Sequence, residues 1–352
     1  MKRFKRISAW IIVSLVLQSS VLLYLDKFYF VTETDFKTKK IETPTATPIV
    51  KNIEINIPSK ATHVSTSFDG KFVAYYDSDN LEVVNTVDGT KKQVSFEKDE
   101  KVSFYKWLPD INAMIIAEKK TTSKGDTLSF SNYDVQKDKK KDISVDSKGK
   151  TNVINLPDKQ SEVQDIVMST LTNMIYIKID HKGNKNSVYS MNVMSQIEKL
   201  RLYSVSTGDV LTFTHEARLA YEDGVYGKVY VTGINKPITI KGVAKIALIA
   251  TDDENKLYVG QLEGTKVSKI YYGLVKEATD KWKTIELKNQ VDKKDIHVSL
   301  EGDIYVNDNL KGIVTNINTG KETKYTGKFL QIYKGGIAAI SNGKLVKVNF
   351  EK

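Results

Sequence analysis

The chain has 352 residues, a net charge of +10 and no cysteine. The absence of cysteine excludes disulfides, thiolate zinc sites, a cysteine nucleophile and a lipoprotein anchor. The positive charge is almost all lysine, whereas recognition of bases and phosphates favours arginine, so nucleic acid is not an expected partner. A lysine-rich surface outside a membrane would fit anionic wall polymers or lipid headgroups; the alternative is that it only keeps the domain soluble.

The first element in chain order is a predicted membrane-spanning helix. Residues 7–25 read as an apolar run of 19 residues behind a basic tip, close to the ~20 residues that cross a bilayer. Because positive charges mark the cytoplasmic side, we expect residues 1–6 to be a short cytoplasmic tail. Residues 7–25 would then be an uncleaved signal anchor, with the rest of the chain outside the cytoplasm at a bacterial cell membrane. The alternative is a cleaved signal peptide, which requires a shorter apolar core and a small-residue cleavage site.

Residues 26–52 are predicted to be an extracytoplasmic spacer. The segment from Thr32 to Lys51 is polar and contains Pro44, Pro48 and several threonines. This composition is typical of an exposed linker, which here would separate the domain that follows from the bilayer.

The remaining residues, 53–352, predict short β-strands separated by tight turns. The first unit has expected strands at 62–68, 71–76, 81–85 and 92–96, with Asp69-Gly70 and Asp88-Gly89 at two of its turns. Glycine at such a turn accepts the positive φ that a tight hairpin requires. The pattern recurs in five further units, with expected strands at 102–107, 113–118, 128–135 and 141–145; 163–168, 174–179, 187–194 and 197–202; 210–214, 218–221, 228–232 and 237–240; 245–250, 256–261, 267–274 and 282–287; and 296–300, 303–306, 312–317 and 322–325.

The last unit has only three expected strands, at 329–333, 336–340 and 344–350. An orphan strand at 53–57 precedes the first unit, and if it becomes the fourth strand of the last one, the ring closes without an open sheet edge. Seven units of about 43 residues then fill the domain. The pattern predicts an all-β fold, a seven-bladed β-propeller closed by its N-terminal strand, although a count of six or eight blades stays open.

Two turns carry a resemblance to a known group. The run Ser67-Phe68-Asp69-Gly70-Lys71 resembles the S-P-D-G-K blade signature of TolB-type and WD-type β-propellers, and Trp107-Leu108-Pro109-Asp110 resembles its W-S-P-D-G variant. Phe68, Leu108 and Ile111 depart from that consensus. The match covers two blades and implies the fold, without any catalytic residue.

Three of the four histidines are candidate channel-lining residues. His63, His215 and His297 each fall in or just after the expected first strand of a blade, and first strands line the channel of a propeller. If they converged, they could bind a metal or a ligand. The alternative is that each faces its blade core or the rim, because side-chain direction alternates along a strand.

Charged side chains near the same strands form a second set of candidates. Asp165 and Asp295 lie there, together with Glu301, Lys106 and Lys245. Carboxylates at a propeller mouth could hold calcium or position a sugar, but one charge per blade is also expected of any solvated channel.

Aromatic and basic segments offer further candidates. Trp107 and Trp282 could stack on sugar rings, or could pack under a turn and between blades. The lysine-dense stretch from Lys119 to Lys150 is expected to be a long connection within the second unit. It could contact an anionic polymer or simply be solvated surface.

No P-loop, dinucleotide fingerprint, H-E-x-x-H helix or EF-hand loop is present, so no catalytic, cofactor-binding or metal residue is assigned and no cofactor is expected. We therefore expect a non-catalytic, membrane-anchored platform or accessory subunit at the cell surface. Its expected partners are the bilayer and an envelope protein or anionic wall polymer. The alternatives are a propeller enzyme of the lactonase, lyase or glycan-hydrolase type, with a polar site at the channel, and a carbohydrate-binding sensor. An exposed Trp282 would favour the sensor.

Overall fold

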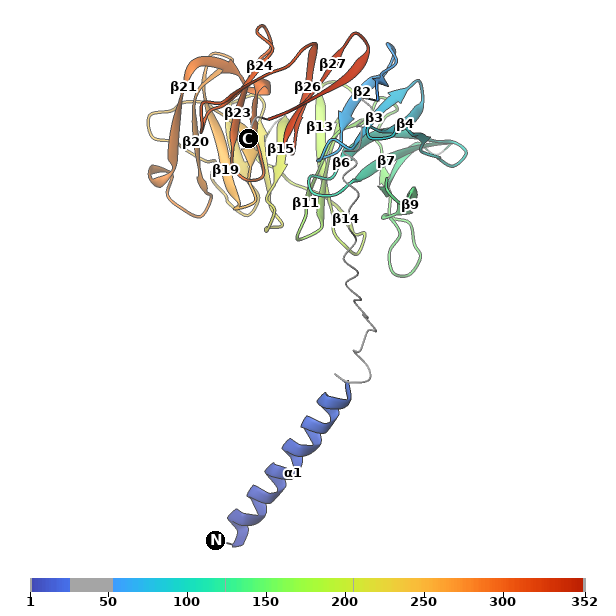
Figure 1. Ribbon diagram of the computed structural model, residues 1–352, viewed down its shortest axis with the longest axis vertical. Helices are drawn as coiled ribbons and strands as arrows, with labels where there is room; N and C mark the ends of the chain where they lie inside the picture. The colour runs from blue at the N-terminus through green and yellow to red at the C-terminus, as the bar shows by residue number, and fades with distance from the viewer. Residues whose placement is uncertain (1, 26–52, 124, 205, 351–352) are drawn as a thin grey trace, which may run out of the picture. The chain divides into compact units, whose positions relative to one another are not determined.

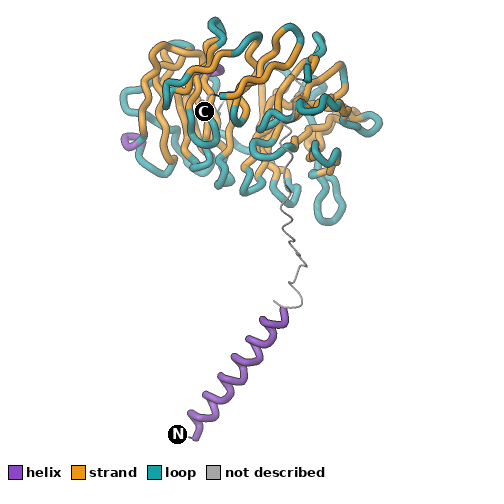
Figure 2. Tube along the Cα trace, viewed as in Figure 1, coloured by secondary structure: helices purple, strands orange, loops and turns teal. Residues whose placement is uncertain are grey.

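A computed structural model describes residues 2–25, 53–123, 125–204 and 206–350, and the chain divides into two compact units, Met1–Lys51 and Asn52–Lys352. In the first unit the described element is one helix, α1 (Lys2–Tyr24) (Figure 1). The second unit consists almost entirely of strands and turns (Figure 2). The predicted spacer at 26–52 lies outside the described residues.

The helix α1 forms where the membrane span was predicted. Among the described residues, however, no helix is both long and apolar enough to cross a membrane. The run at 7–25 is less apolar than the prediction took it to be, because Ser14, Gln18, Ser19 and Ser20 interrupt it. The Ser20 hydroxyl donates a hydrogen bond to the Val16 carbonyl (2.8 Å), as serines inside helices often do.

The second unit contains seven antiparallel sheets in the described residues, so the prediction of seven blades is confirmed. The first three blades are β2 (Thr62–Thr66), β3 (Phe72–Asp77), β4 (Asn80–Asn85) and β5 (Lys91–Gln93); β6 (Glu100–Trp107), β7 (Ala113–Thr122), β8 (Gly125–Asp134), β9 (Lys139–Asp142) and β10 (Ile154–Asn155); and β11 (Glu162–Ser169), β12 (Met174–His181), β13 (Lys185–Met191) and β14 (Ile197–Lys199).

In the next three blades, as in the first three, the strands follow one another in chain order from the channel outward. They are β15 (Thr207–Thr212), β16 (Leu219–Asp223) and β17 (Lys228–Val231); β18 (Ile246–Thr251), β19 (Lys256–Glu263), β20 (Lys266–Leu274) and β21 (Lys283–Asp292); and β22 (Ile296–Val298), β23 (Ile304–Asp308), β24 (Ile313–Asn316) and β25 (Glu322–Lys324). Two short 3-10 helices, η2 (Thr279–Lys281) and η3 (Lys293–Asp295), precede β21 and β22.

The N-terminal strand closes the ring, as predicted. The seventh blade contains β26 (Lys328–Tyr333), β27 (Gly336–Ser341) and β28 (Lys344–Asn349), and β1 (Ile55–Asn56) is its fourth strand. Ile55 pairs with Leu345 in an antiparallel register, and the Ile57 amide donates to the Gly343 carbonyl (2.8 Å). First strands of successive blades contact one another, and β26 contacts β2, so the last blade meets the first.

The signature turn of blade 1 shows why its sequence favours a hairpin. Asp69 accepts hydrogen bonds from the Ser67 hydroxyl (3.0 Å) and the Lys71 amide (3.1 Å). Gly70 follows at φ 68°, a left-handed conformation that glycine adopts without steric cost. Local chemistry therefore determines this turn, which explains why it was predictable.

Two expected details are wrong. In blade 4 the predicted strand at 237–240 makes only an isolated bridge between Val229 and Ile238, because Pro237 has no amide proton to continue the ladder. In blade 2 the stretch from Lys119 to Lys150 is not a long connection, since most of it belongs to β7, β8 and β9. The interruption lies instead at 143–153, between β9 and β10, which both pair with β8.

The core is divided among the junctions between blades. Seven clusters of buried apolar side chains occur in the described residues, each drawn mainly from two neighbouring blades. The cluster between blades 7 and 1 includes Ile55 of β1 and Ile57, which follows β1. It also includes Val73 and Tyr75 of β3. Each blade is therefore held on both sides by apolar burial, the dominant favourable term in folding.

Candidate functional site: the central cavity

A cavity of about 840 Å³ lies along the centre of the ring. Its wall consists of side chains from β2, β6, β18, β22 and β26, with Leu211 from β15. It extends to the turns between the first and second strands of several blades, where Phe68, Pro109, Leu300 and Lys334 line it. We call this end of the propeller the inner-turn face.

The wall is largely aromatic and aliphatic, with both uncharged polar and charged side chains among them. Phe104, Tyr105 and Trp107 of β6 contribute rings. Gln331 accepts a hydrogen bond from the Thr66 amide (3.1 Å) and donates one to the Thr66 carbonyl (3.0 Å), which joins β26 to β2. The Thr66 hydroxyl is buried and has no partner among the described residues, so it is available to a ligand or to water.

His63 lies on this wall in a strained conformation. Its φ is 51°, which is uncommon for a residue other than glycine. Its ring stacks on Tyr76 with centroids 5.4 Å apart and meets Phe104 and Tyr105 edge-on. Desolvation among these rings lowers the pKa of His63, so the neutral imidazole is favoured at neutral pH.

His297 lies on the same wall, from β22. Burial lowers the pKa of its imidazole, and the charge of Asp295 opposes this effect only partly. Its ring centroid is 5.2 Å from that of Phe329, and its buried Nε2 has no hydrogen-bond partner among the described residues. Of the eight histidine and charged candidates, the structure places four in the cavity wall: His63, His297, Lys106 and Glu301.

Lys245 does not line the cavity, and the other three candidates outside it have contacts elsewhere. His215 lies in the loop after β15, where its Nε2 donates to the Asp253 carbonyl (2.7 Å). Asp165 forms an ion pair with Lys106 (2.8 Å) and so links β11 to β6. Asp295 accepts a hydrogen bond from the Asn309 side chain (2.6 Å). Among the described residues, no group of three or more histidine and acidic side chains is placed to hold a metal ion.

Trp107 and Trp282 pack inside the propeller, which was the alternative to stacking on sugar rings. Trp282 is 7% exposed, belongs to the core between blades 4 and 5, and donates from Nε1 to the Leu274 carbonyl (3.1 Å). Trp107 packs against the core between blades 1 and 2 and donates to the Ser65 carbonyl (3.2 Å). The exposed Trp282 that would favour a carbohydrate sensor is therefore not found.

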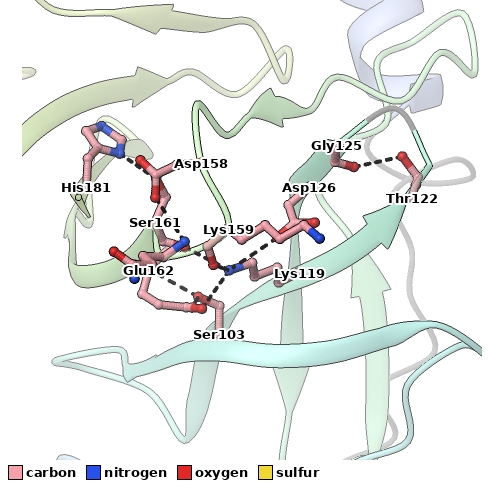
Figure 3. A network of polar contacts seen from close by, with 12 residues as sticks. Ser103, Lys119, Thr122, Gly125, Asp126, Asp158, Lys159, Ser161, Glu162 and His181 are labelled. Carbon is pink, nitrogen blue, oxygen red and sulfur yellow. Dashed lines mark hydrogen bonds and ion pairs between the residues drawn. The ribbon is translucent and has the colours of Figure 1, made fainter.

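Sequence reasoning missed a buried polar network centred on Lys119 (Figure 3). Lys119 is 3% exposed, and its ammonium group lies 2.6 Å from Glu162, 3.6 Å from Asp126 and within 3.0 Å of two carbonyl oxygens. Beside it, Ser161 contacts His181 Nδ1 (2.8 Å), whose Nε2 contacts Ser187 (2.6 Å). The network joins blade 2 to blade 3, and no local pattern distinguishes Lys119 from the neighbouring lysines.

The chain matches no family model and no curated protein. Among solved structures it is similar to one described as "Crystal Structure of Mitotic Checkpoint Complex", with a TM-score of 0.50 and 13% identity over 84% of this chain and 90% of that one. It is also similar to the Cps50 (Swd1) β-propeller domain of Myceliophteria thermophila, with a TM-score of 0.50 and 10% identity over 85% of this chain and 100% of that one. At these identities the likeness shows the fold alone, a β-propeller.

Proposed function

We propose that this propeller is a non-catalytic platform that binds an envelope protein through its inner-turn face. The supporting observation is a set of exposed apolar side chains at the turns of several blades. Ile111, Leu171 and Leu300 lie in first-to-second-strand turns of blades 2, 3 and 6, and each is substantially exposed. Apolar side chains exposed at the turns of one face offer surface that a bound partner could bury.

The test is site-specific crosslinking in living cells. A photoreactive amino acid at Ile111, Leu171 or Leu300 should give discrete adducts with a partner protein. Leu310 is 99% exposed in the turn between β23 and β24 of blade 6, and serves as the matched control. Equal adducts at Leu310, or none at the three test positions, would overturn the proposal. An adduct sensitive to glycan-degrading enzymes would instead indicate a wall polymer.

We further propose that α1 attaches the propeller to the cell membrane, with the bulk of the chain outside the cytoplasm. Large apolar side chains along α1, including Trp10, Leu17 and Leu22, are exposed within its unit. Positive residues precede this stretch, which is the arrangement expected of an N-terminus kept inside. The turn sequences of blades 1 and 2 support the additional proposal of a TolB-type propeller.

Membrane attachment is tested by fractionation. The full-length chain should resist salt and carbonate extraction from membranes, whereas a variant without residues 2–25 should be released. Protease added to intact cells should digest the propeller. A full-length chain recovered in the soluble fraction would contradict attachment.

A further inference from the structure

The outer strand of blade 2 carries an insertion that its sheet does not need. Residues 143–153 separate β9 from β10, and both of these strands pair with β8. The insertion folds as a small hairpin, with a bridge between Val145 and Thr151. Asp146 stabilises its tip by accepting hydrogen bonds from the Lys148 and Lys150 amides, both at 2.9 Å. In Figure 1 the loop that follows β9 projects beyond the strands around it.

The hairpin is fastened to blade 3 at Ser195, a buried residue in the turn between β13 and β14. The Ser195 hydroxyl donates to the Ile143 carbonyl (2.7 Å), with the Val145 carbonyl at 3.1 Å. In return, the Asn152 side chain donates to the Ser195 carbonyl (2.9 Å). These contacts bring Val145 beside the Met194 segment and hold both backbones in a fixed arrangement.

This junction presents four exposed apolar side chains, which we call the hairpin patch: Val145, Val153, Val193 and Met194. Val193 and Met194 are 70% and 55% exposed. No core cluster of the described residues includes any of the four. Methionine is a flexible, polarisable side chain that is enriched in protein interfaces.

The charge around the hairpin patch is positive on balance. Lys139, Lys141, Lys148 and Lys150 are exposed, and none forms an ion pair with another described residue. Two nearby carboxylates accept hydrogen bonds from backbone amides, Asp142 from Ser144 and Asp146 from the hairpin tip. Their two negative charges are outnumbered by those four lysines. These lysines would therefore attract a segment that carries carboxylates, and the positions of the lysines would favour one orientation of it.

We propose that the hairpin patch binds a short segment of a partner protein that combines one or two apolar side chains with flanking Asp or Glu residues. The apolar side chains pack on Val193 and Met194, and the carboxylates pair with Lys148 and Lys150. The observations favour a peptide over a lipid surface, because interfacial anchoring relies on Trp, Phe and Leu, which the patch lacks. This inference rests on the proposed platform function, and it adds a second contact surface and the chemistry of the partner segment that binds there.

The test selects peptides from a phage-displayed random library on the full-length chain. Enriched sequences should combine acidic and apolar residues, and a synthetic enriched peptide should bind more weakly as salt is raised. The variants Lys148→Glu/Lys150→Glu and Val193→Ser/Met194→Ser should each weaken that peptide by about tenfold or more. The matched controls Lys182→Glu/Lys185→Glu and Leu310→Ser alter exposed residues in other turns and should change nothing. All variants should melt like the native chain, because the altered side chains are exposed.

The remaining outcomes overturn the inference in distinguishable ways. If the selected peptides bind the patch variants as well as the native chain but do not bind Ile111→Ser/Leu300→Ser, the hairpin patch is not the binding site, whereas the proposed platform function stands. If no peptide is enriched on the full-length chain, both the hairpin patch and the platform function are contradicted. Displacement of the peptide by dihexanoyl-phosphatidylserine, but not by its choline analogue, would assign the patch to anionic lipid. Self-association that Val193→Ser/Met194→Ser abolishes would assign it to a second copy.

Discussion

At the scale of single residues, the surroundings of a side chain decide what it contributes. Lys119 and Lys269 are both strand lysines paired with a glutamate. Lys119 is buried among Asp126, Glu162 and two carbonyl oxygens, whereas the Lys269 pair is exposed to solvent. A buried charge without its partner is far more costly than an exposed one, because water no longer stabilises it.

We therefore predict that Lys119→Met destabilises the propeller by roughly 3–5 kcal/mol, since Asp126 is left buried without a counter-charge. Lys269→Met should cost no more than about 1 kcal/mol. Urea unfolding followed by tryptophan fluorescence measures both values. Similar losses for the two variants would contradict a stabilising role of the Lys119 network.

Gly273 is a second residue whose role depends on its neighbour. A Cβ added to it would lie 2.4 Å from the Trp282 ring, so the indole can pack only against a glycine. We predict that Gly273→Ala destabilises by roughly 1–3 kcal/mol through overpacking. Gly224→Ala is the control, because its Cβ would have no contact closer than 3.4 Å. Thermal melting compares them, and an unchanged Gly273→Ala variant would mean that the Trp282 ring relocates freely.

At the scale of elements, the outer edges of the blades explain part of the lysine excess. The outermost strands β5, β14 and β25 are short and carry lysines, among them Lys92, Lys199 and Lys324. Short, charged edge strands discourage edge-to-edge pairing with other chains. Solubility therefore accounts for these lysines without a ligand, and the unpaired lysines of the blade 2 hairpin are the ones that we assign to binding.

The closing strand β1 is the other element with a clear energetic role. Ile55 is buried between blades 7 and 1, whereas Ile53 is 37% exposed. We predict that Ile55→Ala destabilises by about 2–4 kcal/mol and that Ile53→Ala costs less than about 1 kcal/mol. Urea unfolding distinguishes them. Equal effects would mean that ring closure does not depend on packing at β1.

At the scale of the whole molecule, three histidines in different blades together make the free energy of unfolding depend on pH. Burial lowers the pKa of His63 and His297 in the cavity wall and of His181 at the junction of blades 2 and 3. Each folded-state pKa lies below the ordinary value of 6.5, so the unfolded chain binds more protons in acid. Their stabilising effect is fully present above pH 6.5 and is lost as pH falls through the folded-state values.

We predict that the free energy of unfolding falls between pH 7.5 and 5.5, and that His297→Gln reduces this fall. Urea unfolding of the native chain and the variant at both pH values measures it. The comparison also tests whether the cavity wall stays dry around His297, because a solvated imidazole would leave the pH profile of the variant identical to that of the native chain.

Local chemistry in the sequence was enough to determine the fold. Alternating side chains and turns such as Asp69-Gly70 specify hairpins within a few residues, and the leftover strand near Ile55 has one place to pair in a closed ring. The prediction of seven blades and of a closing N-terminal strand followed from grouping these hairpins into units of four strands. The missing fourth strand of blade 4 was signalled by Pro237, which the pattern reading did not weigh.

Only the tertiary structure decided which residues reach the central cavity. The register shifts within β2, between Thr62 and Ser65, and within β11, between Val163 and Asp165. A bulge of one residue turns the following side chains to the opposite face, so His63 and Asp165 could not be placed by alternation alone. The burial of Lys119 likewise depends on Glu162, 43 residues away, in another blade. Such contacts are set by how blades pack, which no local pattern encodes.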